Sequence, residues 1–363
     1  MGRVNKDVGG YRGRRTITDI LKFIAVALGV IVVLVLAGGL YLQKYMVYTD
    51  EGPKLELPPF LQMFRQGEKE PGVSSSHPNS GSVSVVIDPG GSASEPPAEP
   101  EKPGLAIQLT VDDVLNGTAA ARLEEAGADT LILEAKASSG QLIWHSDLFT
   151  ADWAEVNAPQ SNNEALKQWN EGKVYTVARV CCFRDDSVPY SLNKRALRKG
   201  NYNWRDELGL RWMSPAHEEN QAYIAGLCGE LAALGFDEIV LEQWHFPVGG
   251  KTENITRGDR YDPNAFTTEL EDMLTQVQGA LGPYDTKLSL RFGAEALNDG
   301  CSLSGLSPEL LDRFASRFWT EQEGRMSLSA SPAVRDLQER TVEIVPQADE
   351  DREFFQAVIP PKE

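Results

Sequence analysis

Short apolar runs of strand length recur through the C-terminal two thirds of the chain, and stretches with helical spacing lie between them. The runs cover 105–111, 130–136, 174–183, 238–244, 287–293 and 341–346, with a weaker one at 314–320. The helical stretches include 117–126, 164–170, 218–234 and 265–281. Gly235 suits the end of the third helix. Strands that alternate with helices predict parallel strands joined by helical crossovers.

The number of these units favours a barrel. About 260 residues from Gly104 onward carry seven or eight of them, and a (β/α)8 barrel typically needs ~250 residues. A doubly wound open sheet is the alternative, but no glycine-rich phosphate turn follows the first strand. We therefore predict an α/β fold, a (β/α)8 TIM-type barrel at 104–363 that is irregular in its last third.

The N-terminal part has a different pattern. Residues 23–43 form an uncharged apolar run, which at ~1.5 Å per residue spans roughly 30 Å, the thickness of a bilayer core. Residues 1–22 are basic, and excess Lys and Arg stay on the cytoplasmic side. We therefore predict a cytoplasmic tail, a single-pass transmembrane anchor and an extracellular C-terminal domain. A signal peptide cleaved near 37–39 is the alternative, which the length of the run disfavours.

The segment 44–103 is predicted to be a disordered linker. Its part from 71 to 103 is rich in Pro, Ser, Gly and Glu, and buries too little apolar surface to offset the entropy of ordering. The formal net charge of the chain is −18 although residues 1–48 are net basic, so the exterior part is strongly acidic. This charge argues against nucleic acid as a partner.

Four consecutive predicted strands carry charged residues on one face near their carboxyl ends. Alternate side chains of a barrel strand face the interior. With the apolar residues of these strands facing the helices, the interior receives Glu134, Lys136, Arg179, Glu242, Trp244 and Arg291. Barrel enzymes place their active sites at the carboxyl ends of the strands. The alternative is a structural layer of ion pairs that closes the barrel.

The carboxylates in this group suit acid–base chemistry. The surrounding cations favour the ionised form of Glu242, which suits a nucleophile or a stabiliser of positive charge. The second catalytic carboxylate is either Glu134 in the same ring or Glu295 just past the fifth strand. Glycoside hydrolysis uses two carboxyl groups ~5–5.5 Å apart for retention or ~6.5–9.5 Å apart for inversion. Neighbouring strands lie ~4.8 Å apart, so either outcome is open.

Aromatic residues gather on the predicted loop face, where they suit the apolar faces of sugar rings or act as core plugs. They are Trp144, Tyr202, Trp204, Trp212 and Trp244. His245 directly follows the fourth strand, within reach of a substrate. The predicted substrate-binding residues are Lys136, Arg179, Arg291, Trp244, His245 and Trp212. Neither the histidines nor the cysteines have metal-ligand spacing, and we predict no metal and no cofactor.

The cysteines leave their pairing open. They are Cys181, Cys182, Cys228 and Cys301. Because neighbouring residues on a strand point to opposite faces, Cys181 and Cys182 are predicted to be separate buried residues. One disulfide is compatible with an extracellular domain.

Four segments resemble motifs of a bacterial family of glycosyl hydrolase domains. Residues 234–247 (LGFDEIVLEQWHFP) resemble the family's L-G-F-D-E-I-Q-F-D-Y-I-R-F-P. Residues 130–144, 174–185 and 203–215 resemble its second strand, its third strand and a loop with two spaced Trp. The resemblance covers residues 104–291 and implies a (β/α)8 barrel distantly similar to the α-amylase type.

The sequence departs from the family pattern at the fourth strand. Glu242 stands where the family has Asp, and Gln243 and His245 replace Tyr and Arg. Glu134 also replaces an Asp, whereas Lys136, Arg179 and Asp185 match. A carboxylate displaced by about 1 Å can cost ~10²-fold in rate, so both a divergent substrate and a lost activity are open.

Two functions follow. The first is a membrane-anchored glycoside hydrolase that acts on cell-wall or extracellular polysaccharide, with Glu242 central. The second is a non-catalytic barrel that binds glycan or a partner protein at the cell envelope. The expected partners are a polysaccharide or oligosaccharide, and the membrane through the N-terminal helix.

Overall fold

The computed structural model describes residues 46–49, 52–55, 104–297 and 302–360. The chain divides into two compact units, Met1–Ser92 and Ala93–Glu363. In the first, β1 (Met46–Thr49) pairs antiparallel with β2 (Gly52–Leu55). The rest of the predicted linker and the whole predicted anchor lie outside the described residues. Within the described parts of the chain, no helix combines the length and the apolar character that a membrane crossing requires.

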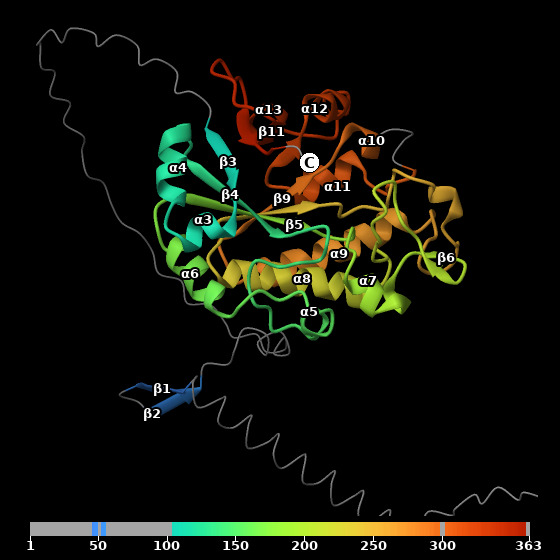
Figure 1. Cartoon of the computed structure of the whole chain (residues 1–363), viewed down its shortest axis with the longest axis horizontal. Helices are drawn as coiled ribbons and strands as arrows, with labels where there is room; N and C mark the ends of the chain where they lie inside the picture. The colour runs from blue at the N-terminus through green and yellow to red at the C-terminus, as the bar shows by residue number, and fades with distance from the viewer. Residues whose placement is uncertain (1–45, 50–51, 56–103, 298–301, 361–363) are drawn as a thin grey trace, which may run out of the picture. The chain divides into compact units, whose positions relative to one another are not determined.

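The second unit is a closed barrel of eight parallel strands (Figure 1). The strands are, in order around the barrel, β3 (Leu105–Leu109), β4 (Thr130–Lys136), β5 (Tyr175–Cys181), β8 (Glu238–Glu242), β9 (Lys287–Arg291), β10 (Phe318–Thr320), β11 (Thr341–Val345) and β12 (Phe355–Val358). Because β12 pairs with β3 in parallel, the sheet has no open edge. The barrel prediction is confirmed, and the open-sheet alternative is excluded.

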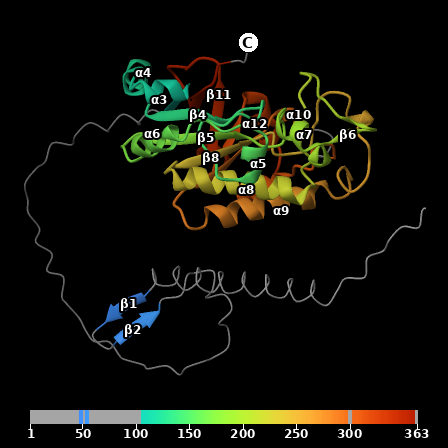
Figure 2. The same cartoon turned by 60° about the horizontal axis from the view of Figure 1, so that its bottom comes forward.

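Helices cover the outside of the barrel, with α8 and α9 packed against each other along one side (Figures 1 and 2). The helices are α3 (Val111–Leu115), α4 (Ala119–Ala126), α5 (Phe149–Trp153), α6 (Ser161–Asn170), α7 (Val188–Ser191), α8 (Glu218–Ala233), α9 (Phe266–Leu281), α10 (Ala294–Leu297), α11 (Pro308–Phe314), α12 (Gln322–Ser329) and α13 (Leu337–Arg340). A small hairpin of β6 (Arg198–Lys199) and β7 (Tyr202–Asn203) lies in the β5–α8 connection. Gly235 follows α8 with φ of +89°, a conformation that glycine adopts without strain, as the sequence predicts.

The last third of the barrel is irregular, as expected. Strand β10 has three residues, and β11 runs into β12 through a loop instead of a helix. The sequence analysis identified no eighth strand. Strand β12 has only four residues and follows an acidic segment, 349–353, so its pattern is too short to be distinctive.

The barrel interior is filled by apolar side chains below the carboxyl ends of the strands. They are Ala106, Ile132, Val177, Val240, Trp319, Val342, Ile344 and Ala357. At the amino-terminal end, the indole of Trp319 donates to Glu238 Oε1 at 2.9 Å, and Arg317 forms an ion pair with the same carboxylate. Glu238 and Trp319 are both completely buried at this end, whereas polar side chains at the other end line an open cavity.

Candidate active site

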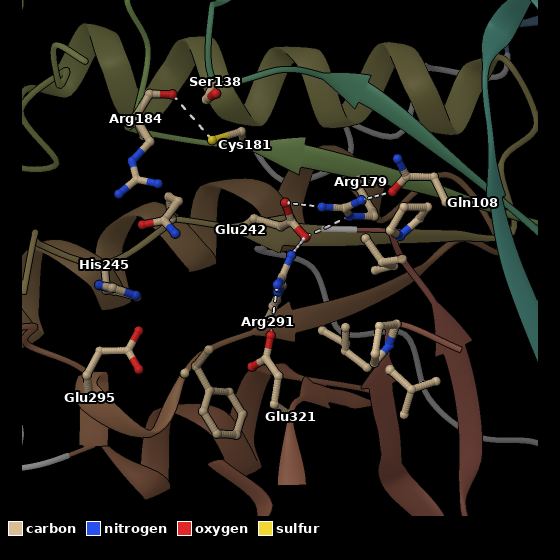
Figure 3. A pocket seen from close by; sticks show the side chains of 18 of the residues that line it. Gln108, Ser138, Arg179, Cys181, Arg184, Glu242, His245, Arg291, Glu295 and Glu321 are labelled. Atoms are coloured by element: carbon tan, nitrogen blue, oxygen red, sulfur yellow. Dashed lines mark hydrogen bonds and ion pairs between the residues drawn. The ribbon is translucent and has the colours of Figure 1, made fainter. Parts of the chain in front are cut away.

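A cavity of about 440 Å³ opens at the carboxyl ends of the barrel strands (Figure 3). Its polar lining includes Gln108, Ser138, Arg179, Arg184, Glu242, Gln243, His245, Arg291, Glu295 and Glu321. Active sites of barrel enzymes lie at this end of the strands. Five of the predicted site residues line the cavity: Glu242, Glu295, Arg179, Arg291 and His245.

Two arginines hold the carboxylate of Glu242, the last residue of β8. Arg179 of β5 donates from Nε to Oε1 at 2.7 Å and from Nη2 to Oε2 at 2.8 Å. Arg291 of β9 donates from Nη1 to Oε1, also at 2.7 Å. The strand alternation in the sequence predicts this inward orientation. Leu241 and Leu290, which directly precede Glu242 and Arg291 on their strands, pack outward against the helices.

The arginines decide the charge of Glu242. Burial raises the pKa of this carboxyl group, since only 9% of its side chain is exposed, but the charges and hydrogen bonds of Arg179 and Arg291 outweigh burial and lower the pKa to about 2. Glu242 is therefore an anion at neutral pH and cannot act as a proton donor there. It can stabilise positive charge beside it.

Two further carboxyl groups line the cavity. Glu295 lies in α10, just past β9, and in Figure 3 its carboxyl group points toward the ring of His245. Glu321 directly follows β10 and accepts a hydrogen bond from Arg291 Nη2 at 2.9 Å. Glu321 was not predicted as a site residue, because the apolar run at 314–320 is too weak to mark it as a strand-end position.

The segment after β8 departs from the strand alternation at Gln243, whose φ is +49°. Because of this turn, Gln243 and His245 line the cavity, whereas Trp244 is completely buried in the apolar core between barrel and helices. The prediction that Trp244 faces the interior is therefore wrong. Its indole donates to the carbonyl of Arg291 at 2.9 Å.

The imidazole ring of His245 is buried, which favours its uncharged form. Burial lowers its pKa, although the nearby carboxylate of Glu295 acts in the opposite direction. Its Nδ1 lies 2.7 Å from the carbonyl oxygen of Phe246, which can only accept a hydrogen bond. In the tautomer that this contact requires, Nδ1 carries the proton and Nε2 is an acceptor.

Lys136 does not reach the cavity, contrary to the prediction. A register irregularity follows Glu134 in the pairing of β4 with β5, so Lys136 leaves the alternation of its strand. Its ammonium group is fully buried and lies 2.7 Å from Asp185 Oδ2 and 2.7 Å from the carbonyl oxygen of Cys181. Glu134 is partly buried, opposite Arg179 in the register, and is not among the residues that line the cavity.

Trp212 is also buried away from the cavity. Its indole donates to Asp206 Oδ2 at 2.9 Å, and the guanidinium of Arg184 lies 5.5 Å from the ring centroid. It supports the loop that carries Arg184 at the rim. Among the described residues that line the cavity, none is Trp or Tyr.

Four lining residues from the first three strands and the segments after them were not predicted as site residues: Gln108, Ser138, Cys181 and Arg184. Gln108 of β3 accepts a hydrogen bond from Arg179, and follows the same alternation that places Ala106 in the interior. Arg184 forms an ion pair with Asp206 at 2.8 Å. Cys181 also lines the cavity, while Cys182 packs on the opposite side of β5, as predicted. Cys182 and Cys228 are free thiols, and Cys301 lies outside the described residues.

The charges around the cavity balance. Three arginines, Arg179, Arg184 and Arg291, face three carboxyl groups, Glu242, Glu295 and Glu321. A ligand without net charge therefore suits the cavity better than a polyanion. Across the described ranges, no three His, Cys, Asp or Glu side chains come together in a way that would hold a metal ion.

Comparisons with known proteins extend this description. Residues 110–299 match the family described as "Putative glycosyl hydrolase domain". No curated protein matches the sequence.

Among solved structures, the chain is similar to the glycoside hydrolase domain of PgaB (BpsB) from Bordetella bronchiseptica, with 11% identity over 67% of this chain and 83% of that one, and a TM-score of 0.44. A variant of the glycoside hydrolase domain of PelA from Pseudomonas aeruginosa shows 15% identity over 66% and 83%, with a TM-score of 0.38. A hypothetical protein from Ruminiclostridium thermocellum ATCC 27405 shows 17% identity over 51% and 96%, with a TM-score of 0.43.

These TM-scores are too low to support conclusions about this chain. The family match, in contrast, extends over more than half of the sequence and includes β4, β5, β8 and β9. It therefore includes Glu242 and the two arginines that bind it, Arg179 and Arg291, which we call the Glu242 clamp. The chain therefore belongs to the family described as "Putative glycosyl hydrolase domain".

Proposed function

We propose that the protein is a glycoside hydrolase that cleaves a neutral polysaccharide or oligosaccharide in the cavity at the barrel mouth. The observation that carries the proposal is that two carboxyl groups, those of Glu242 and Glu295, line one cavity at the carboxyl ends of the strands. Glu242 is held as an anion by two arginines, and Glu295 lies beside a neutral histidine. Glycoside hydrolysis needs one ionised carboxylate and one proton-donating carboxyl group.

In the proposed reaction, Glu295 gives its proton to the glycosidic oxygen. The bond between that oxygen and the anomeric carbon breaks, and the electron pair of the bond leaves with the departing alcohol. Glu242 stabilises the positive charge that develops on the sugar ring, either as a nucleophile or electrostatically. Water supplies the hydroxyl group of the product and returns a proton to Glu295. Glu321 is a less suitable donor because Arg291 already engages its carboxylate.

A substitution at Glu295 tests the assignment of the proton donor. We expect Glu295→Gln to lower turnover of a natural glycan by ~10²–10⁴-fold, the usual contribution of general acid–base catalysis. An aryl glycoside with an acidic phenol as leaving group needs little protonation, so the loss on that substrate is expected to be much smaller. Reducing-end and phenol release measure the two rates.

The variant Glu164→Gln is the matched control, since Glu164 is exposed in the first turn of α6, on the outside of the barrel. Unchanged turnover in Glu295→Gln on every substrate would remove Glu295 from the mechanism. Equal losses on natural and aryl glycosides would instead indicate a role other than proton donation.

A non-catalytic glycan-binding barrel is the second candidate. It is favoured by the clamp itself, since both oxygens of Glu242 accept hydrogen bonds from arginines and little of the side chain is exposed. A barrel of this kind would retain a glycan without releasing reducing ends. A panel of glycans, assayed in parallel for retention and for reducing ends, separates the two candidates.

The proposed location of the enzyme is the outer face of the cell membrane, where cell-wall or extracellular polysaccharide is within reach. The support is in the sequence: the uncharged run 23–43 follows the basic segment 1–22. We expect the full chain to remain with bacterial membranes after an alkaline wash, and a variant that lacks 23–43 to be released. Recovery of the full chain in the soluble fraction would contradict the proposed anchor.

A further inference from the structure

Exposed aromatic side chains gather on two short helices outside the catalytic cavity. Phe149 and Trp153 belong to α5, and Tyr190 belongs to α7; 65%, 57% and 71% of these residues are exposed. The two helices contact each other and lie side by side in both views (Figures 1 and 2). A second cavity, of about 560 Å³, is lined by Trp153 and Tyr190 together with polar residues. We call it the aromatic cavity, and the cavity around Glu242 the catalytic cavity. This volume is in the range of small-molecule sites, ~300–1,000 Å³.

The aromatic rings are held in place despite their exposure. The ring centroids of Phe149 and Trp153 are 5.5 Å apart. The guanidinium of Arg211 lies 4.9 Å from the ring centroid of Tyr190, and its Nη1 forms an ion pair with Asp186 Oδ1 at 2.7 Å. A ring whose position is already fixed loses little conformational entropy when a ligand packs on it.

The backbone beside this cavity is strained. Glu155, which lines it, has φ of +54° although it is not glycine. Within the described residues only Gln243 and Asp336 share this property, and Gln243 lines the catalytic cavity. Strained residues of this kind gather at ligand sites more often than elsewhere.

A hydrogen bond connects a lining residue of one cavity to a lining residue of the other. Ser138 lines the catalytic cavity, and its carbonyl oxygen accepts a hydrogen bond from the backbone of Asp186, which lines the aromatic cavity, at 3.2 Å. Ser187, which also lines the aromatic cavity, donates from Oγ to the carbonyl oxygen of Ser139, the neighbour of Ser138, at 2.8 Å. The residues that meet here belong to the segments that follow the carboxyl ends of β4 and β5, so they lie at the same end of the barrel.

We propose that the aromatic cavity is a distal subsite that binds a sugar unit of a neutral polysaccharide whose other units occupy the catalytic cavity. The inference rests on the proposed function. Flat, amphipathic rings suit the apolar faces of sugars. The carboxylates of Glu155 and Asp186 and the hydroxyl of Ser191 offer partners for sugar hydroxyl groups.

A sugar suits this cavity better than a protein surface. The rings do not form a continuous apolar patch, because charged side chains share the lining with them. The catalytic cavity also lacks Trp and Tyr among its described lining residues, so a long glycan finds its aromatic contacts here rather than there.

Affinity electrophoresis of the full chain tests the subsite. The probes are gels that contain a neutral β-glucan, a galactomannan, an arabinoxylan or glycol chitin. We expect at least one polymer to retard the wild type, and the double variant Trp153→Ala/Tyr190→Ala to bind that polymer at least about tenfold more weakly. Tyr284→Ala is the matched control, because Tyr284 is 42% exposed in the connection from α9 to β9, at the other end of the strands. It is expected to migrate as the wild type does.

Two results would overturn the subsite: equal retardation of the double variant and the wild type, or no retardation of the wild type in any of the gels. The second result leaves a protein partner as the occupant of the aromatic surface.

The experiment distinguishes failure of the subsite from failure of the proposed hydrolysis. If the wild type releases no reducing ends but the double substitution abolishes retardation, the subsite stands and the proposed function fails. If hydrolysis and retardation of the double variant both equal those of the wild type, the proposed function stands and the subsite fails. With both correct, the double variant loses about tenfold in kcat/KM on the polymer and little on an oligosaccharide too short to span both cavities.

Discussion

Glu242→Gln is expected to lower the turnover of any glycan that the wild type hydrolyses by at least ~10²-fold. An amide carries no charge, so the substituted side chain cannot stabilise the positive charge on the sugar ring; removal of one preorganised electrostatic contact typically costs ~10²–10³-fold. The two arginines would then add positive charge beside the reacting carbon without compensation. Reducing-end release by wild type and variant, at saturating and at low substrate, measures the effect. Equal rates would exclude Glu242 from the mechanism.

The same variant must be checked for folding, because Glu242 also contributes to stability. Its folded-state pKa of about 2 lies below the usual 4.5, so its contribution to the free energy of unfolding is fully present above pH 4.5 and is lost as the pH falls toward 2. The size of that contribution is about 3 kcal/mol, from ~1.36 kcal/mol per pKa unit. Urea unfolding at pH 6 and pH 3 should show the gap between wild type and Glu242→Gln narrowing in acid.

Glu242→Asp keeps the charge that both arginines need and shortens the side chain by one methylene. We expect it to retain most of the stability and to lose activity through the displacement of the carboxylate, by ~10²-fold for about 1 Å. A stable Glu242→Asp protein without activity would therefore assign the loss to position rather than to folding.

The largest effect on stability is expected for Lys136→Met. The ammonium group and the carboxylate of Asp185 are both completely buried, and loss of one partner of such a pair typically costs ~3–5 kcal/mol. Asp185 would keep its hydrogen bonds from the backbone of Ser187 and Val188 but would have no counter-ion. The free energy of unfolding in urea measures the loss.

The double variant Lys136→Met/Asp185→Asn distinguishes this account from simple loss of packing. Because Asn is neutral and can still accept the two backbone hydrogen bonds, the double variant should be more stable than Lys136→Met alone. The exposed Lys173→Met is the control and is expected to change stability by less than ~0.5 kcal/mol. A loss below ~1 kcal/mol in Lys136→Met would contradict the importance of the buried pair.

The Lys136–Asp185 pair and the Glu242 clamp illustrate the two expectations for inward charges. Lys136 and Asp185 form a completely buried ion pair that a ligand cannot reach, as the alternative of a structural layer of ion pairs predicts. The Glu242 clamp lines an open cavity together with the carboxyl groups of Glu295 and Glu321. The charged residues that looked like one cluster in the sequence therefore divide into a structural part and a candidate catalytic part.

The sequence by itself determined the barrel and the inner face of its strands. Period-two alternation is a local property, and it was sufficient to bring Arg179, Glu242 and Arg291 together, because parallel strands in register place their carboxyl ends at one rim. It also separated Cys181 from Cys182. The apolar residues that alternate with these charged residues, such as Leu241 and Leu290, pack between the barrel and the helices.

Only the tertiary structure decided what happens where strands end. The register irregularity after Glu134 and the positive φ of Gln243 reverse the expected directions of Lys136 and Trp244, and neither is visible in the pattern of apolar residues. The role of Glu321 depends on closure of the barrel, which brings a three-residue strand next to β9. Alternation determines the direction of a side chain only for residues within a regular strand. Beyond it, contacts between residues distant in the sequence set the direction.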